Sequence, residues 1–167
     1  MATTGVTMQP EVYAVGGGVA DYYSLAGGET VARGDLIRIT SAGTVKLAEA
    51  STSGAGALHG IVLEAATTSS TEVKIFKFAT DTLIKIQCVD TVAPEDLAKG
   101  KAYTIEDGTN VWGITDTDTN GVLTVVDTAA NRQPWTIARG GFDQTASTDN
   151  NAVIARVSQS ILDGNAS

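Results

Sequence analysis

Short runs of alternating apolar and polar residues, each ended by glycine or a small polar turn, set the strongest limit on how this chain folds. "DLIRIT" places Ile37 and Ile39 on one face and Arg38 on the other, and "TVKLAEA" alternates in the same way after the turn "SAG". The pattern recurs in "HGIVLEAA", "TEVKIFKFA", "TLIKIQCV", "AYTIED", "NVWGITD", "GVLTVVD", "PWTIARG" and "NAVIARVSQSIL". Short strands at this spacing predict an all-β fold, with a small barrel or a sandwich as its form.

A twelve-residue segment occurs twice, as "GETVARGDLIRI" at 28–39 and "PEDLAKGKAYTI" at 94–105. Four aligned positions are identical: Glu29/Glu95, Ala32/Ala98, Gly34/Gly100 and Ile39/Ile105. Each copy precedes a set of strands, and its glycine stands where a tight turn or a positive φ is needed. The repeat therefore predicts a β-barrel or β-tulip-like body of two related lobes, 28–89 and 90–167, with chance similarity in a chain of narrow composition as the alternative.

One short helix is expected near residues 94–99. Pro94 suits a first helical position, Glu95 and Asp96 suit a first turn, and Gly100 suits a stop.

Residues 1–27 are rich in glycine and small residues, yet they hold three of the four tyrosines. A disordered tail usually lacks such residues, whereas a segment that becomes ordered against a partner uses tyrosine for contact area. We therefore expect an extended N-terminal arm with Tyr13, Val15, Tyr22 and Tyr23 at its partner interface.

The charge of the chain argues against several classes of partner. Its formal net charge is −8, so no basic stripe is present for nucleic acid. No apolar run is long enough to span a bilayer, and the first residues lack the basic start and apolar core of a secretory signal. We expect no nucleic acid and no membrane as partners, and assembly in a cytoplasm.

Catalytic and metal-binding residue sets are sparse. His59 is the one histidine and Cys88 the one cysteine, which leaves too few ligands for zinc and no recognisable Ser–His–Asp elbow. Cys88 alternates with Ile84 and Ile86, which favours a buried, inert thiol. The tripeptide Arg-Gly-Asp at 33–35 lies at a strand start, where a structural role is favoured. The sequence predicts no enzyme, no cofactor and no resident metal.

The segment "DTDTNGVLTVVD" allows two interpretations. Asp116, Asp118, Asn120, Gly121 and Asp127 match positions 1, 3, 5, 6 and 12 of a calcium loop. Asn120-Gly121 is also a strong signal for a two-residue hairpin turn, and the flanking residues are typical of strands. We favour an antiparallel hairpin over 111–128 without bound metal.

The arm followed by "GETVARGDLIRI" and "LHGIVLEAA" resembles the head decoration (cement) proteins of tailed bacteriophages. Those proteins share a glycine-containing strand start, a strand and turn, and a later strand of the form x-G-[IV]-[VL]. The matching positions are Gly28, Val31, Gly34, Asp35, Leu36, Gly60, Ile61 and Val62. The resemblance covers about residues 13–80.

What the resemblance implies is a small β-rich protein on the outer capsid surface of the virion. It would form a homotrimer and bind the major capsid protein after the head expands, clamping neighbouring subunits. A carbohydrate-binding or adhesion module on the virion surface is the alternative. That module needs an exposed aromatic ridge, for which Trp112 and Trp135 are the candidates, and we interpret both as core residues.

Overall fold

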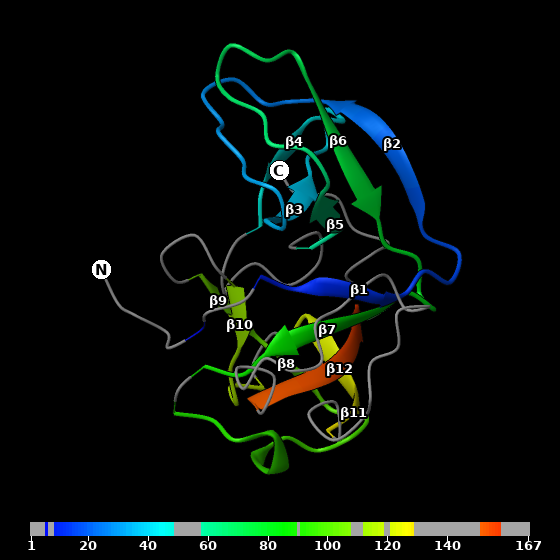
Figure 1. Ribbon diagram of the computed structural model, residues 1–167, viewed down its shortest axis with the longest axis vertical. Helices are drawn as coiled ribbons and strands as arrows, with labels where there is room; N and C mark the ends of the chain where they lie inside the picture. The colour runs from blue at the N-terminus through cyan, green and yellow to red at the C-terminus, as the bar shows by residue number, and fades with distance from the viewer. Residues whose placement is uncertain are drawn as a thin grey trace.

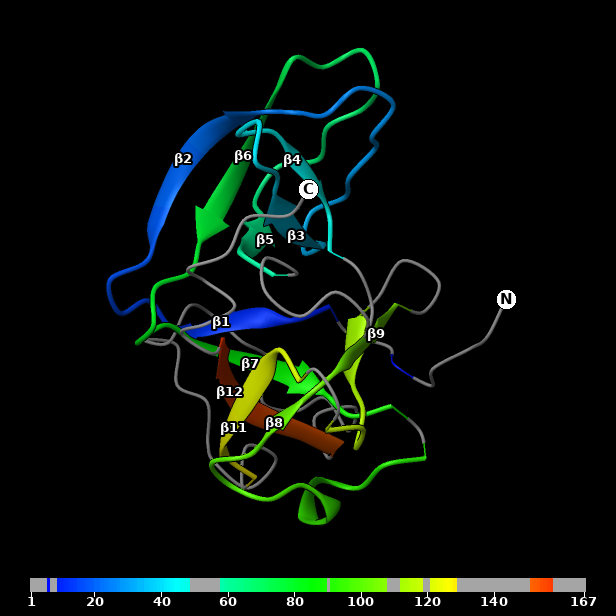
Figure 2. The same ribbon diagram turned by 180° about the vertical axis from the view of Figure 1, so that it is seen from behind.

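The computed structural model describes residues 6, 9–48, 58–89, 91–107, 112–118, 121–128 and 151–157. Within these residues the chain is all-β, as predicted, and the pairs of neighbouring strands are antiparallel. Two main sheets follow one another along the long axis of the molecule (Figures 1 and 2). The described strands do not close into a barrel, so that form of the prediction is wrong.

The first sheet has the strand order β2-β6-β5-β3-β4. Its members are β2 (Val19–Ser24), β3 (Leu36–Ile39), β4 (Val45–Leu47), β5 (Gly60–Val62) and β6 (Glu72–Lys77). The second sheet has the order β1-β7-β12-β11-β8, and a separate hairpin pairs β9 with β10. Its members and the hairpin are β1 (Glu11–Ala14), β7 (Leu83–Gln87), β8 (Ala102–Tyr103), β9 (Ile105–Asp107), β10 (Trp112–Ile114), β11 (Leu123–Asp127) and β12 (Ala152–Val157).

The two sheets repeat one topology. Reading β8 and β9 as one strand interrupted at Thr104, the order β7-β12-β11-β8/β9-β10 matches β2-β6-β5-β3-β4 strand for strand. Thr104 bridges the two parts, because its N–H donates to Thr117 O at 2.9 Å and its carbonyl accepts from Thr115 N at 3.0 Å. The fold is therefore an internal duplication, as the twelve-residue repeat predicts.

The repeated glycines form the same turn in both copies. Ala32–Asp35 and Ala98–Lys101 each close with a backbone hydrogen bond from the fourth residue to the first, at 3.1 and 3.2 Å. Gly34 and Gly100 stand at the third position with φ of 90° and 82°, a conformation that costs a side chain about 1–2 kcal/mol. The glycine in each copy is thus required by the turn that begins the strand.

The same glycines also bond to equivalent residues of a later strand. Gly34 N donates to Val62 O at 2.9 Å, and Gly100 N donates to Val125 O at 2.7 Å. The N–H of each valine returns to the carbonyl of the residue that follows the glycine, at 2.9 and 3.0 Å. Val62 and Val125 are therefore equivalent positions, although no sequence similarity between them was apparent.

The equivalence extends to the strand before each repeat. Ala26 N donates to Val45 O, and Val89 N donates to Ile114 O, both at 3.0 Å. Each lobe thus begins one strand earlier than predicted, and we define the first lobe as residues 19–77 and the second as 83–157. β7 pairs with β12 and therefore belongs to the second lobe. The boundary predicted at residue 89 had placed β7 in the first lobe.

The predicted helix is one 3-10 turn, Pro94–Asp96. It lies in the segment between Val89 and Gly100, which is three residues longer than the matching segment between Ala26 and Gly34. Asp96 Oδ2 accepts the N–H of Ala93 at 3.0 Å, which caps the turn. The three extra residues lie before Pro94, because the repeat aligns Pro94–Asp96 with residues 28–30, which are not helical in the first lobe.

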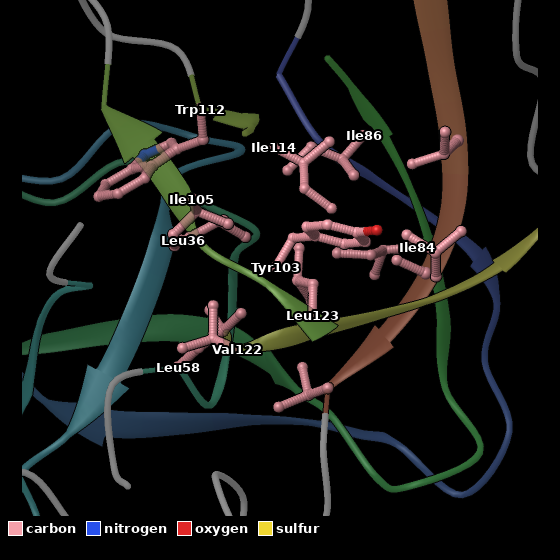
Figure 3. Close-up of a cluster of buried hydrophobic side chains, with 14 of the residues drawn as sticks. Leu36, Leu58, Ile84, Ile86, Tyr103, Ile105, Trp112, Ile114, Val122 and Leu123 are labelled. Atoms are coloured by element: carbon pink, nitrogen blue, oxygen red, sulfur yellow. The ribbon is translucent and has the colours of Figure 1, made fainter. Parts of the chain in front are cut away.

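The hydrophobic core follows the duplication. One cluster belongs to the first lobe and contains Val31, Ile37, Ile39, Val45, Val62, Ala66, Val73 and Ile75. Seven of these eight positions, all except Ala66, have counterparts in the larger cluster: Leu97, Tyr103, Ile105, Ile114, Val125, Val153 and Ala155. The larger cluster also takes in Leu36 and Leu58 of the first lobe, so the second core joins the two lobes (Figure 3).

The predicted N-terminal arm is part of the body from Gln9 onward. β1 pairs with β7 and β2 pairs with β6, so this segment supplies one edge strand to each sheet. The side chain of Gln9 packs over Gly34, where an added Cβ would lie 2.8 Å from Gln9 Cβ. The assignment of 1–27 as a free arm is therefore wrong for its described part, because its strands complete the ladders of both lobes.

The hairpin predicted over 111–128 does not form. β10 pairs with β9, and β11 lies between β8 and β12, so β8 separates the two strands that the turn was expected to join. Gly121 lacks the positive φ of a type I′ turn. It is needed instead for a close backbone approach, since an added Cβ would lie 2.4 Å from the carbonyl carbon of Ala102. Asn120 and the expected strand "PWTIARG" lie outside the described residues.

Candidate partner-binding edge

The outer edge of β2 is the most exposed strand surface of the described part of the chain. Its sequence, Val19–Ser24, reads "VADYYS", and β-branched and aromatic residues favour a strand. β2 pairs with β6 along its whole length, from Val19 opposite Lys77 to Ser24 opposite Glu72. No described strand pairs with its other side, and we call that side the β2 edge.

Successive side chains of β2 point to opposite faces of the sheet. Tyr23 is half-buried and packs against the first-lobe cluster. Tyr22 points the other way, is 54% exposed, and has the Nζ of Lys74 5.8 Å from its ring centroid. The ammonium holds the ring over the sheet through a cation–π contact, so Tyr22 presents a defined aromatic surface next to the open edge.

Two more exposed apolar side chains precede Tyr22 along the chain, and of these Val19 lies on the opposite face of β2, together with Asp21 and Tyr23. Val15 is 54% exposed and Val19 is 61% exposed, and with Tyr22 they make three of the four large apolar side chains exposed in the described residues. The turn that carries Val15 is fixed by the segment before β7, because Thr82 Oγ1 donates to Val15 O at 2.9 Å. Asp81 Oδ1 accepts the N–H of Gly17 at 2.8 Å. The turn between β1 and β2 is therefore tied to the segment that joins the two lobes.

Along β2, residues whose backbone N–H and C=O groups bond to β6 alternate with residues whose groups do not. Leu25 N donates to Thr71 O at 3.1 Å, and the antiparallel register then assigns the bonds to β6 to residues 19, 21 and 23. The N–H and C=O of residues 20, 22 and 24 consequently point outward. The N–H of Tyr22 is met by the Oδ1 of Asp21 at 2.8 Å, in agreement with this assignment.

The structure separates the four predicted interface residues into two pairs. Tyr13 packs against the small cluster of Ala152 and Ile154, and Tyr23 packs against the first-lobe core. Val15 and Tyr22 are exposed, with Val15 between β1 and β2 and Tyr22 on β2. Val19 was not among the residues predicted from the sequence. It lies two residues before Asp21 in "VADYYS", so in a strand the two side chains share a face, and the aspartate indicates that this face is exposed to solvent.

Two of the three acids of the proposed calcium loop are paired with lysines. Asp118 Oδ2 forms an ion pair with Lys101 Nζ, and Asp127 Oδ1 lies 3.8 Å from Lys99 Nζ. The hydrogen bond to Asp118 raises the pKa of Lys101, and the same bond lowers the pKa of Asp118. The described residues contain no group of three or more His, Cys, Asp or Glu side chains placed to hold a metal ion. These two acids thus form part of a charged surface around the second repeat.

The remaining candidate side chains are buried in structural roles. His59 Nδ1 accepts the N–H of Ile39 at 3.0 Å, next to β5. Burial raises the pKa of the Cys88 thiol to about 12, and the nearby charges of Asp96 and Glu95 add to the shift, so the thiol is inert as expected. Asp35 of the Arg-Gly-Asp tripeptide is buried and accepts from Ala32 N at 2.8 Å and Gln9 Nε2 at 3.0 Å, which confirms its structural role.

Comparison with known proteins gave no match to a protein-family model, to a curated protein or to a solved structure. The described part of the chain has no helix long and apolar enough to cross a membrane.

Proposed function

We propose that this protein is a capsid decoration protein, which binds the outer surface of an expanded phage head and clamps neighbouring capsid subunits. The observation that carries the proposal is the presence of three exposed apolar side chains, Val15, Val19 and Tyr22, on or next to a strand whose outer edge is open in the described residues. Exposed apolar side chains gathered at an unpaired edge are typical of sites that take up an extended segment of a partner. The resemblance of residues 13–80 to the cement proteins supports the same role.

In this role binding depends on contact and not on catalysis. An extended segment of the major capsid protein would bond to the outward N–H and C=O groups at residues 20, 22 and 24, and Val19 and Tyr22 would bury apolar area. Three copies arranged as a trimer would raise the effective concentration of such contacts without adding any new one. The proposed location is the outer capsid surface of the virion, after assembly in the host cytoplasm.

The carbohydrate-binding alternative has less support. Trp112 was one of the two candidates for an aromatic platform, and it is 1% exposed within the larger core cluster (Figure 3). Trp135, the other candidate, lies outside the described residues. A sugar site of the usual kind stacks the ring on exposed aromatic faces, and Tyr22 alone offers one at the β2 edge.

The test is binding to expanded, undecorated heads of the phage that encodes this chain, followed by sedimentation of the heads. We expect the protein to sediment at a fixed ratio to the major capsid protein. The double variant Val15→Lys/Val19→Lys should lose at least tenfold in affinity, about 1.4 kcal/mol, because two ammonium groups replace the apolar contact.

Val126→Lys is the matched control, since Val126 is the exposed valine of β11 in the second lobe. It should bind like the unmodified protein. Failure of the unmodified protein to bind the heads would refute the proposed function, and equal binding by the double variant would refute the proposed surface. Removing residues 1–20 is unsuitable for this purpose, because it would also remove β1 and part of β2.

A further inference from the structure

The duplication shows what covers the edge of the second lobe that is equivalent to the β2 edge. β7 is the counterpart of β2, and its outer side is paired with β1. Tyr22 pairs with Lys74 on β6, and the equivalent Lys85 pairs with Ile154 on β12. On the outer side of β7, Lys85 faces Glu11 of β1. The same position of the fold thus holds an antiparallel strand in one lobe and is open in the other.

We propose that the β2 edge pairs with β2 of a second copy of this chain, antiparallel and about a two-fold axis that passes through Tyr22. The second copy would use the same outward groups as the proposed capsid segment, so this pairing belongs to the free protein and competes with capsid binding. A two-fold axis perpendicular to the joined sheet keeps both inner faces on one side. Residue i of one copy must then face residue j of the other with i + j even, which leaves few registers.

Charge decides between the two central registers. An axis through Asp21 would place the two aspartates directly opposite each other, with their Cβ atoms about 4.5–5.5 Å apart, and like charges in this position are destabilising. An axis through Tyr22 places Asp21 opposite Tyr23 of the second copy and joins the outward groups as 20 with 24 and 22 with 22. It therefore satisfies the three outward-facing residues and makes the two Asp21 side chains diagonal neighbours, about 7–8 Å apart, instead of placing them directly opposite each other.

The side chains of the outer face agree with this register. Tyr22 of one copy faces Tyr22 of the other, and cross-strand aromatic pairs are among the favourable ones, at roughly 0.2–1 kcal/mol. Each ring keeps its Lys74 on the far side, at 5.8 Å. The two Lys74 residues are separated by three strand spacings, about 14 Å, which exceeds the Debye length of about 8 Å. The contact thus carries no appreciable repulsion on this face.

One side chain opposes the pairing in the isolated protein. Asp21 Oδ1 accepts the outward N–H of Tyr22 at 2.8 Å, and this bond must break before Tyr22 can pair. A charge that occupies an edge donor is a common protection of natural edge strands. We therefore expect a weak, reversible dimer with a Kd of roughly 1–100 µM, which Asp21→Ala tightens at least threefold.

The experiment is sedimentation velocity of the full chain from about 0.5 to about 500 µM, which spans that range of Kd. The unmodified protein should shift from monomer to dimer. Ala20→Pro should remain monomeric, because the proline removes an N–H that points away from β6 and leaves the fold intact. Val126→Lys should dimerise like the unmodified protein.

Amide hydrogen exchange of the unmodified protein gives a second measurement that needs no variant. Protection at residues 20, 22 and 24 should rise with concentration, while protection at 19, 21 and 23 should not change. A protein that stays monomeric at about 500 µM, or a dimer that Ala20→Pro leaves unchanged, would overturn the proposal. Binding to phage heads in either case would leave the proposed function standing.

Discussion

The two lobes share one topology but differ in whether another strand pairs with their outer edge strand. In the second lobe, β1 covers β7, and Tyr13 packs on Ala152 and Ile154. In the first lobe, β2 has no described neighbour on its outer side, and Tyr22 is exposed. A duplicated fold begins with two equal edges, and here one edge is closed within the chain while the other is open in the described residues.

The cores differ in the same sense. The first-lobe cluster is formed by residues of that lobe alone, whereas the larger cluster also contains Leu36, Leu58, Ile61 and Phe76 of the first lobe. Equivalent positions therefore have different surroundings. The second lobe is the structural centre of the molecule, and the first lobe projects from it with one edge open (Figure 1).

The largest expected effect comes from truncating an equivalent core pair. Ile105→Ala removes a fully buried side chain from the larger cluster and should lower the free energy of unfolding by about 4 kcal/mol. Ile39→Ala, at a position 7% exposed in the first-lobe cluster, should cost about 2–3 kcal/mol. Urea denaturation followed by tryptophan fluorescence measures both values. Equal losses would contradict the view that the second lobe is the structural centre.

Deleting residues 1–14 tests whether β1 belongs to the body. The deletion uncovers the edge of β7 and removes the half-buried side chains of Val12 and Tyr13. We expect a loss of about 2–3 kcal/mol from apolar burial and strand hydrogen bonds, together with new concentration-dependent association through β7. Thermal unfolding and size-exclusion chromatography report the two effects. An unchanged melting temperature would restore the interpretation of a free arm.

The repeated glycines allow a finer comparison. Gly100→Ala meets no atom within 4 Å, so it should cost only the positive φ, about 1–2 kcal/mol. Gly34→Ala carries the same cost and also collides with the side chain of Gln9, so it should destabilise more. Adding Gln9→Ala to Gly34→Ala should recover part of the difference, measured by urea denaturation. A Gly100 variant more harmful than the Gly34 variant would show that the close approach of Gln9 does not matter.

The smallest expected effect concerns the residue after each repeated glycine. Asp35 is buried and hydrogen-bonded, whereas its counterpart Lys101 is exposed and paired with Asp118. The pKa of Asp118 is lowered from 3.8, so the pair stabilises the fold above that pH and the contribution is lost as the pH falls below it. The pKa of Lys101 is raised from 10.5, so the contribution is also lost at still higher pH.

Asp118→Asn should therefore lower the melting temperature slightly at neutral pH and low salt, and the difference should vanish below pH 3.8. Differential scanning calorimetry across pH, with Asp116→Asn as the control, measures it. A difference that grows as the pH falls, or a stabilisation by calcium that Asp118→Asn abolishes, would point back to a metal loop.

The sequence by itself determined the strands and the duplication. Alternation at Ile37 and Ile39 is a local property of a half-buried strand, and it holds whatever the strand pairs with. The glycines at 34 and 100 were recognisable because a positive φ is also a local demand, independent of the rest of the fold. Cys88 and Trp112 were also correctly interpreted as buried.

Only the tertiary structure decided which strands are neighbours. Asn120-Gly121 is a strong local turn signal, but β8 lies between the strands it was expected to join, and no local pattern reveals an intervening strand. The segment before residue 28 was taken for an arm because edge strands bury little and alternate weakly. The structure of this segment depends on two strand pairings, β1 with β7 and β2 with β6. In each pairing the partner strand lies roughly fifty to seventy residues away along the chain. Val19 and Tyr22 form an exposed edge for the same reason, since exposure is set by what the rest of the chain leaves uncovered.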